Sequence, residues 1–187
     1  MRRTLPTFLL ASIMLTACAA QEPAEVTTLV AANTSTEVPE ISTDGLPIDA
    51  LPAVARTAQT ACPYLDTTWV ADTNGQRVTG YGTDERFSTP SCVFYSFPEE
   101  PQLTVIIREM ATVDDAIAVV DWAAPIDSTE PAEEPLGWSG GRRGGNTESG
   151  ALYAVQKDKT AVIVFTNQDQ SLKAQLIAEE TIQNLGL

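Results

Sequence analysis

The sequence predicts an α+β domain, in which helices pack against an antiparallel β-sheet of about five strands in two layers, with one disulfide. Segments 92–97 and 103–108 alternate apolar and polar residues around a Pro-Glu-Glu-Pro turn, which is typical of paired antiparallel strands. Segments 112–124 and 171–185 instead repeat apolar residues at the spacing of one helical face. Polar positions on the strands favour a sheet with one covered face.

The N-terminus has the pattern of an export signal. Arg2 and Arg3 precede an apolar run over 8–14, which is shorter than the ~20 residues that a membrane-spanning helix needs. The following Leu-Thr-Ala-Cys, ending at Cys18, resembles the lipobox of bacterial lipoproteins. The resemblance implies a signal peptide over 1–17, a lipidated Cys18, and attachment to the cell membrane on its extracytoplasmic face. The alternative is an ordinary signal peptide in which Cys18 has no role.

Composition divides the rest of the chain into two parts. Residues 18–45 are rich in Thr, Ser, Glu and Pro and show no sustained apolar period, so we expect the lipidated cysteine to be followed by a disordered tether. Residues 46–187 have the composition of a packed domain and are long enough for one hydrophobic core. The sequence therefore predicts a single folded domain over 46–187.

The charge excludes several classes of function. The chain has 11 basic and 25 acidic residues, a net charge of -14, and it contains no histidine. An acidic surface of this size repels nucleic acid, so we expect no nucleic-acid partner. Without histidine, Ser-His-Asp and Cys-His catalysis and histidine-ligated zinc or haem are excluded. We therefore expect no cofactor and no metal site.

The cysteines predict one covalent cross-link. If Cys18 carries lipid, Cys62 and Cys92 remain as a pair in an oxidising compartment, where a structural disulfide is the expected outcome. The alternative is a reactive thiol pair, which lacks the Cys-x-x-Cys spacing and any neighbouring histidine.

The first half of the domain starts with two predicted helices. Over 51–62, apolar residues recur on one helical face, with Asp49 as a cap and Pro52 in the first turn. A second short helix is predicted over 64–70, before the Asn74-Gly75 turn. Residues 76–90 are expected to form an irregular loop between the two cysteines of the disulfide. The two strands at 92–97 and 103–108 follow.

The second half of the domain starts with the most clearly predicted helix of the chain. Thr112 and Asp115 form a capping-box pattern, and the helix is expected to end before Pro125. An acidic, Pro-containing loop is predicted between Asp127 and Pro135. The remaining elements are three strands and a last helix, at 136–143, 151–156, 160–166 and 171–185, with Gly186 just past the helix end.

Several short motifs resemble an uncharacterised actinobacterial, corynebacterial-type family of exported lipoproteins, catalogued as a domain of unknown function. The motifs are Ala61-Cys62-Pro63-Tyr64-Leu65, Thr68-Trp69-Val70, Asn74-Gly75-Gln76-Arg77-Val78, Pro90-Ser91-Cys92-Val93-Phe94 and Gln183-Asn184-Leu185. The resemblance extends from about Leu51 to the end of the chain. It implies a secreted, lipid-anchored domain and no known activity.

One polar stretch, 137–146, is the candidate binding site. Its glycines would let backbone amides approach an anion, and Arg142 and Arg143 could fork onto a phosphate or carboxylate. Among the three tryptophans, Trp138 is the binding candidate because it adjoins these glycines. The alternative is a glycine-bearing strand whose arginines neutralise the surrounding acid.

The expected function is a non-enzymatic module at the cell envelope that binds an envelope protein or a wall ligand. No catalytic residue is predicted. The alternative is a carboxylate-dependent cell-wall hydrolase that uses two acids across a cleft. The acid pairs that could supply them are Glu99-Glu100, Asp114-Asp115, Glu133-Glu134 and Glu179-Glu180.

Overall fold

The computed structural model describes residues 43–187. The predicted signal peptide, Cys18 and the tether up to residue 42 lie outside this range. The described part of the chain contains three helices and seven strands. In chain order they are α1 (Thr67–Asn74), β1 (Gly80–Asp84), β2 (Ser91–Tyr95), β3 (Pro101–Glu109), α2 (Val113–Ala123), β4 (Glu130–Ala132), β5 (Ser139–Arg143), β6 (Leu152–Lys157), β7 (Thr160–Thr166) and α3 (Ser171–Leu185).

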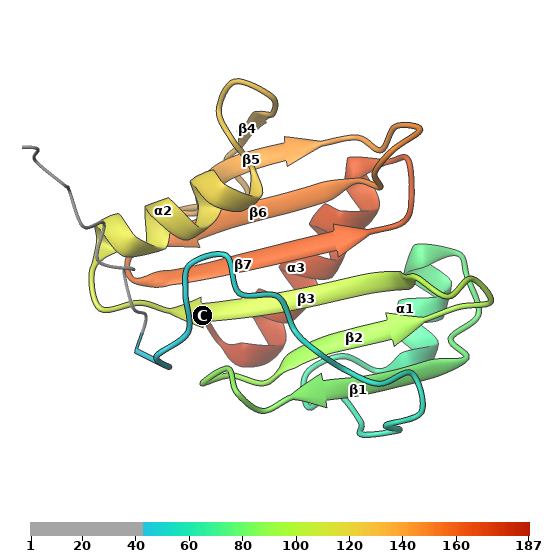
Figure 1. Cartoon of the computed structure of the whole chain (residues 1–187). Helices are drawn as coiled ribbons and strands as arrows, with labels where there is room; N and C mark the ends of the chain where they lie inside the picture. Colours follow the sequence, from blue (N-terminus) through green and yellow to red (C-terminus); the bar gives the residue numbers. More distant parts are fainter. Residues whose placement is uncertain (1–42) are drawn as a thin grey trace, which may run out of the picture. The chain divides into compact units, whose positions relative to one another are not determined.

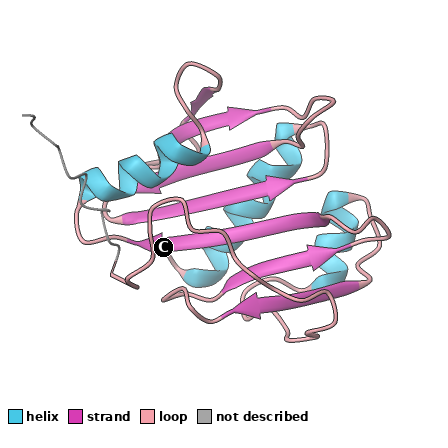
Figure 2. Cartoon of the chain, in the orientation of Figure 1, coloured by secondary structure: helices cyan, strands magenta, loops and turns pink. Residues whose placement is uncertain are grey.

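All seven strands form one antiparallel sheet, in the order β1-β2-β3-β7-β6-β5-β4 (Figures 1 and 2). The central pair, β3 and β7, is in register from Leu103 opposite Thr166 to Glu109 opposite Thr160. Each strand neighbours the next one in sequence except at this central pair. The two halves of the chain therefore meet at the middle of the sheet.

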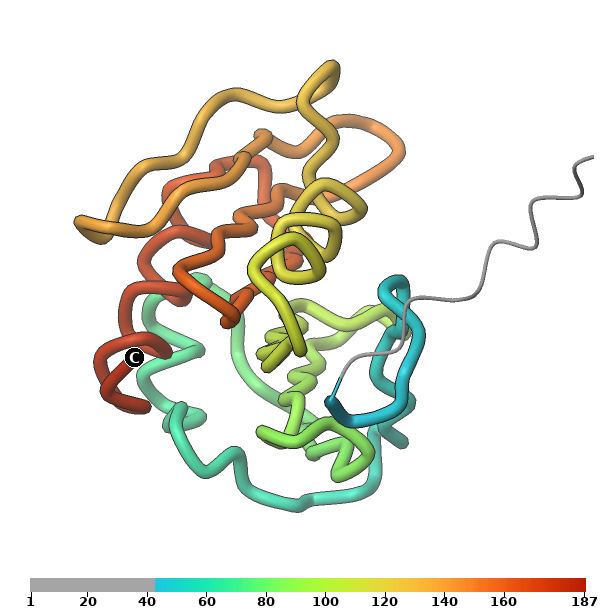
Figure 3. Tube along the Cα trace, turned by 90° about the vertical axis from the view of Figure 1, so that its left-hand side faces the viewer, coloured from blue at the N-terminus to red at the C-terminus, as the bar shows by residue number. Residues whose placement is uncertain are grey.

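The predicted fold class is wrong in two respects. The sheet has seven strands, where about five were expected, and helices cover both of its faces, where two layers were expected. In Figure 3, α3 lies on one side of the sheet and α2 on the other. The unpredicted strands are the two edges: β1 falls in the expected excursion 76–90, and β4 in the expected acidic loop.

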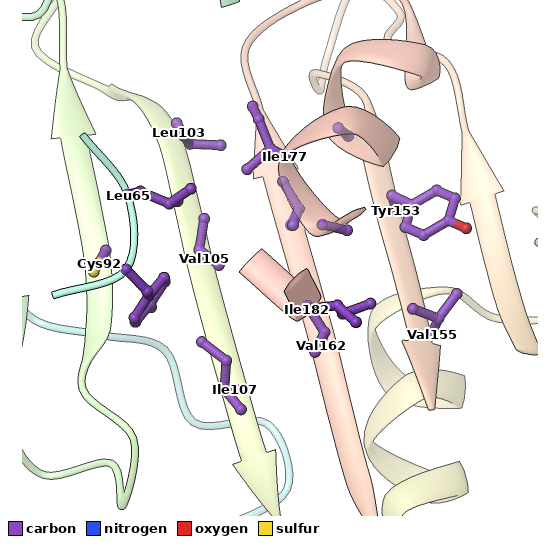
Figure 4. Packing of buried hydrophobic residues seen from close by; sticks show 14 of the residues in the cluster. Leu65, Cys92, Leu103, Val105, Ile107, Tyr153, Val155, Val162, Ile177 and Ile182 are labelled. Carbon is purple, nitrogen blue, oxygen red and sulfur yellow. The ribbon is translucent and has the colours of Figure 1, made fainter. Parts of the chain in front are cut away.

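One face of the sheet, which we call the α3 face, is covered by α3 and α1. Strand residues two apart point to this face, and they pack against apolar side chains of α3 such as Ile177 and Ile182 (Figure 4). Val162 and Val164 of β7 are fully buried at the centre of this cluster. From β2, β3 and β6 the cluster takes Cys92, Phe94, Leu103, Val105, Ile107, Tyr153 and Val155.

The other face, the α2 face, is covered only in part by α2. The alternate residues of β3, β6 and β7 pack here against Ala116, Val119, Val120 and Ala123 of the helix. The predicted capping box starts α2: the Asp115 amide donates to the Thr112 hydroxyl, and the Asp115 carboxylate accepts from the Thr112 amide. Because both faces are buried, the central strands read as nearly continuous apolar runs.

Residues 44–58, which we call the strap, cross the uncovered half of the α2 face, in front of β1, β2 and β3 (Figure 1). The helix predicted over 51–62 is therefore wrong. Burial alternates residue by residue from Asp44 to Arg56, although turns at 47–50 and 55–58 interrupt the extended backbone. The inward positions include Leu46, Ile48, Ala50, Pro52 and Val54, so the sequence carried a period of two that overlaps the helical spacing.

The disulfide predicted between Cys62 and Cys92 is present, with the two Cα atoms 5.7 Å apart. It joins the chain just after the strap to the buried start of β2. None of the helices in residues 43–187 is long and apolar enough to span a bilayer.

Candidate functional site

The N-terminal end of the strap is fixed by a buried arginine. The Arg108 guanidinium, on β3, is 1% exposed and pairs with Asp44 at 3.3 Å. It also donates hydrogen bonds to three successive carbonyls, those of Leu46, Pro47 and Ile48, at 3.0–3.2 Å. Burial lowers the pKa of Arg108, yet an arginine keeps its charge. The charge of Arg108 therefore holds the strap through one ion pair and three backbone carbonyls.

The middle of the strap is fixed by Asp84, at the end of β1. Its carboxylate accepts from the Ala53 amide at 2.8 Å and from the Arg86 guanidinium at 2.6 Å. Arg86 in turn donates to the Leu51 carbonyl at 3.2 Å. The hydrogen bonds from Arg86 lower the pKa of Asp84 to about 2. Asp84 therefore acts as a charged clamp on strap residues 51–53.

A third contact lies nearer the disulfide. Arg56 donates to the Pro98 carbonyl at 2.6 Å and to the Thr79 hydroxyl at 2.7 Å, and its guanidinium lies 5.6 Å from the centre of the Tyr95 ring. The Tyr95 hydroxyl donates to the Val54 carbonyl at 2.8 Å. Arg108 and Arg86 thus bind backbone carbonyls of the strap, whereas Arg56 belongs to the strap and contacts the rest of the domain through its own side chain.

The Asp84 clamp makes stability depend on pH. Because the folded-state pKa is about 2 and the ordinary value is 3.8, the stabilisation is complete above both values and is lost as the pH falls from about 4 to 2. Arg86 is half exposed, so we expect a contribution of about 1–2 kcal/mol. Urea unfolding at about pH 5 and at about pH 2 measures how much unfolding free energy each protein loses on acidification. This loss should be about 1–2 kcal/mol smaller for Asp84→Asn than for the wild type. The exposed Asp72→Asn is the control, and equal losses in wild type and Asp84→Asn would contradict the clamp.

A groove of about 630 Å³ lies on the α2 face, where the strap and α2 both border the sheet. Strap residues 51–54 form one wall and Trp122 of α2 contributes to the other. The floor comes from β2, β3 and β7, and includes Tyr95 and Phe165. The Trp122 and Phe165 rings meet edge to face, with centroids 6.2 Å apart at 78°. The volume falls within the range of known ligand pockets, and the lining includes the aromatic rings of Tyr95, Trp122 and Phe165.

The polar groups of the groove lie toward one end. There, β3 begins at Pro101 and β7 ends at Thr166, and the side chains of Glu100 and Glu148 line the groove together with Asn167. No lysine or arginine is among the lining residues of the described chain. The groove can therefore hold an apolar or aromatic group and favours a positive charge at its polar end.

The structure does not bring the predicted anion site together. Trp138 is only 3% exposed, packs in the core of the α3 face, and has the Lys157 ammonium 5.7 Å from its ring centroid. Arg142 lies opposite Tyr153 and so points to the α3 face, whereas Arg143 lies opposite Leu152 and points to the α2 face. Two neighbours on one strand cannot fork onto a single anion.

The groove residues were not selected from the sequence, although one signal was present. Trp122 and Phe165 are both apolar positions of predicted elements, and only the order of strands shows that they meet. The apolar residues at 46, 48, 50, 52 and 54 were the signal for an extended strap, but apolar residues also occupy outward positions such as Leu51 and Ala53, so the pattern was ambiguous. The strap supplies the wall that turns a flat sheet face into a groove.

The acid pairs serve other roles where their contacts are defined. Asp115 belongs to the α2 capping box, and Glu179 and Glu180 each accept from a residue four positions away on α3. Glu133 and Glu134 line a polar cleft on the α3 face. Across residues 43–187, no group of three or more acidic or cysteine side chains is placed to hold a metal ion.

Comparison with known proteins gives one finding about family. A family model described as "Domain of unknown function (DUF2020)" matches residues 46–187, which is more than half of the chain. No curated protein matches the sequence.

Proposed function

We propose that this chain, which belongs to the DUF2020 family of domains of unknown function, is a non-enzymatic binding module. Its ligand is an apolar segment of a partner protein that carries a basic residue. The observation that supports this proposal is the groove between strap residues 51–54 and Trp122. The partner is an envelope protein, in keeping with the predicted export signal.

The chemistry of the groove favours a peptide over a small metabolite. Leu51 is 57% exposed and Trp122 is partly exposed, so the groove is open to solvent along its walls. An open aromatic groove suits an extended chain that lays successive side chains along it. The carboxylates of Glu100 and Glu148 add attraction for a lysine or arginine of that chain.

A charge-matched pair of peptides tests this function. We expect a peptide Lys-Leu-Pro-Leu-Lys, blocked at both ends, to bind the mature chain carrying Cys18→Ala, and the analogue Glu-Leu-Pro-Leu-Glu to bind at least about tenfold more weakly. Trp122→Ala should reduce binding of the lysine peptide by at least about tenfold, because it removes an aromatic wall. Fluorescence anisotropy of labelled peptides measures both effects.

The matched control is Leu172→Ala, since Leu172 is exposed on α3, which covers the opposite face. This variant should bind the lysine peptide as the wild type does. Equal affinity for the two peptides, or equal effects of Trp122→Ala and Leu172→Ala, would refute the groove as the binding site.

The location of the module is a second part of the proposal. We propose an exported lipoprotein of the actinobacterial type, anchored through lipid on Cys18 to the extracytoplasmic face of the cell membrane. The support is the sequence Leu15-Thr16-Ala17-Cys18 after a basic and apolar leader. Two or more acyl chains on one residue give durable attachment.

The anchor is tested on protein extracted from its native membrane. We expect an intact mass that corresponds to a chain starting at Cys18 plus diacylglycerol and fatty acid. Cys18→Ala should move the protein to the soluble fraction. A mature chain without added lipid mass would overturn the anchor and leave the groove proposal untouched.

A further inference from the structure

A second cleft, of about 440 Å³, lies on the α3 face near the β4 edge. It is lined by residues 131–134, Arg142 of β5, Tyr153 of β6 and Gln175 of α3. Arg142 and Tyr153 are directly opposite each other in the β5–β6 register, so both point to this face. Unlike the groove, the cleft is lined mainly by charged and hydrogen-bonding groups.

Arg142 is the cation that lines this cleft, and it lacks hydrogen-bond partners in the described part of the chain. Its Nε atom is buried and has no hydrogen-bond partner among the residues that the structure describes. The nearest carboxylate oxygen in an ion pair, on Glu130, is 3.9 Å away, which is too long for a hydrogen bond, and Glu130 is 80% exposed. The Nε atoms of Arg108 and Arg143 are likewise buried without a hydrogen-bond partner among the described residues, but Arg108 donates through its other nitrogens to strap carbonyls and Arg143 donates to the Ser149 hydroxyl. Within residues 43–187, the Arg142 guanidinium makes no such hydrogen bond. The Arg142 side chain is 40% exposed, so its guanidinium is open to the cleft, and a ligand carboxylate would supply two acceptors in the geometry that a guanidinium prefers.

Acidic residues line the same cleft as this cation. Glu133 and Glu134 line the same cleft, and Glu179 lies close enough to Tyr153 to act on its hydroxyl. Burial chiefly raises the pKa of Tyr153 to about 12, so its hydroxyl stays protonated and donates to the Glu134 carbonyl, which fixes the backbone beside the cleft. A simple anion would meet these carboxylates and be repelled.

We propose that this cleft binds a free α-amino acid, with its carboxylate on the Arg142 guanidinium and its ammonium group toward Glu133 and Glu134. A zwitterion satisfies the unpaired donor and is attracted by the acids that would reject an anion. The site is separate from the groove, because the two lie on opposite faces of the sheet.

The experiment separates the two charges of the ligand. The mature chain carrying Cys18→Ala is titrated with L-alanine, with propionate, which keeps only the carboxylate, and with ethylammonium, which keeps only the cation. Backbone amide shifts on β5 and β6 report binding. L-alanine should saturate these shifts on the millimolar scale, and each fragment should bind at least about tenfold more weakly.

The control is the neighbouring arginine. Arg142→Gln should weaken L-alanine binding at least about tenfold, whereas Arg143→Gln, on the opposite face, should leave the affinity unchanged. Both variants should keep the thermal midpoint of the wild type; if Arg142→Gln does not fold, Arg142→Lys takes its place.

Two results overturn the site: no saturation by L-alanine up to about 50 mM, or equal effects of the two arginine variants. Propionate binding as tightly as L-alanine would overturn the role of the acids.

Discussion

Replacing Arg108 by methionine should lower the free energy of unfolding by about 3–5 kcal/mol, because it removes one partner of a buried ion pair and of three backbone hydrogen bonds. Methionine keeps much of the side-chain volume, so the loss of unfolding free energy reports the missing interactions of the guanidinium and not the creation of a cavity. The Asp44 carboxylate and the strap carbonyls would lose the guanidinium without gaining water, since Arg108 is 1% exposed. Urea unfolding at neutral pH measures the effect.

The control for this experiment is Arg77→Met, because Arg77 is an exposed arginine of the same domain. It should change the stability by less than about 0.5 kcal/mol. Hydrogen exchange of the strap amides distinguishes two ways in which Arg108→Met can act: faster exchange confined to residues 46–54 indicates local release of the strap. A loss of under about 1 kcal/mol with unchanged exchange would show that the strap is held elsewhere.

Removal of the disulfide should have an effect of similar size. The bond closes a loop with a sequence separation of 30, for which the chain-entropy model gives ~3.6 kcal/mol. The double variant Cys62→Ala, Cys92→Ala should therefore lose about 3 kcal/mol or more, since Cys92 is also fully buried in the core of the α3 face. Chemical unfolding of the oxidised protein and the double variant measures the difference.

Two further samples complete this test. The variant Cys18→Ala alone should match the wild type in stability, and reduction of the wild type should reproduce most of the loss. Thiol titration of the untreated, unfolded protein should find no reactive thiol at Cys62 or Cys92. Two titratable thiols at these positions would contradict the bond.

The elements predicted correctly from the sequence are those whose apolar residues fit only one kind of secondary structure. Helix α3 has the predicted bounds 171–185, and the strand predicted over 160–166 is β7. A capping box fixes the start of α2 at Thr112, because the side chain and backbone exchange hydrogen bonds there. In these elements, local chemistry and burial favour the same structure.

The edge strands and the strap could not be predicted in the same way. β1 has the sequence Gly-Tyr-Gly-Thr-Asp, and its glycines look like turn residues until the fold shows what lies over them: a Cβ at Gly82 would lie 2.6 Å from the Val54 side chain of the strap. β4 is three residues long and contains Pro131, which is tolerated there because the strand is at the sheet edge. In 51–62 the apolar residues fit both a helical face and an extended chain. Contacts with arginines from distant parts of the sequence favour the extended chain.

The candidate sites show the same limit. Trp138 was selected for its neighbouring glycines, but its ring packs in the core of the α3 face, and the partly exposed Trp122 lines the groove instead. Arg142 and Arg143 were selected together as an anion site, but Arg142 lines a polar cleft on the α3 face and Arg143 faces the other side of the sheet. Side-chain direction depends on register, which composition does not reveal.

The attachments of the strap also determine how the domain responds to tension on its N-terminus. A pull on that end loads the contacts of Thr43 with Glu109 and of Arg108 with the strap before the covalent bond at Cys62, which bears load only after the intervening chain has been drawn out. Fully extended, the segment from Asp44 to Cys62 spans about 60 Å. The strap can therefore peel away over this distance, which opens the groove wall at 51–54, while the bond at Cys62 halts further unravelling before the force reaches α1.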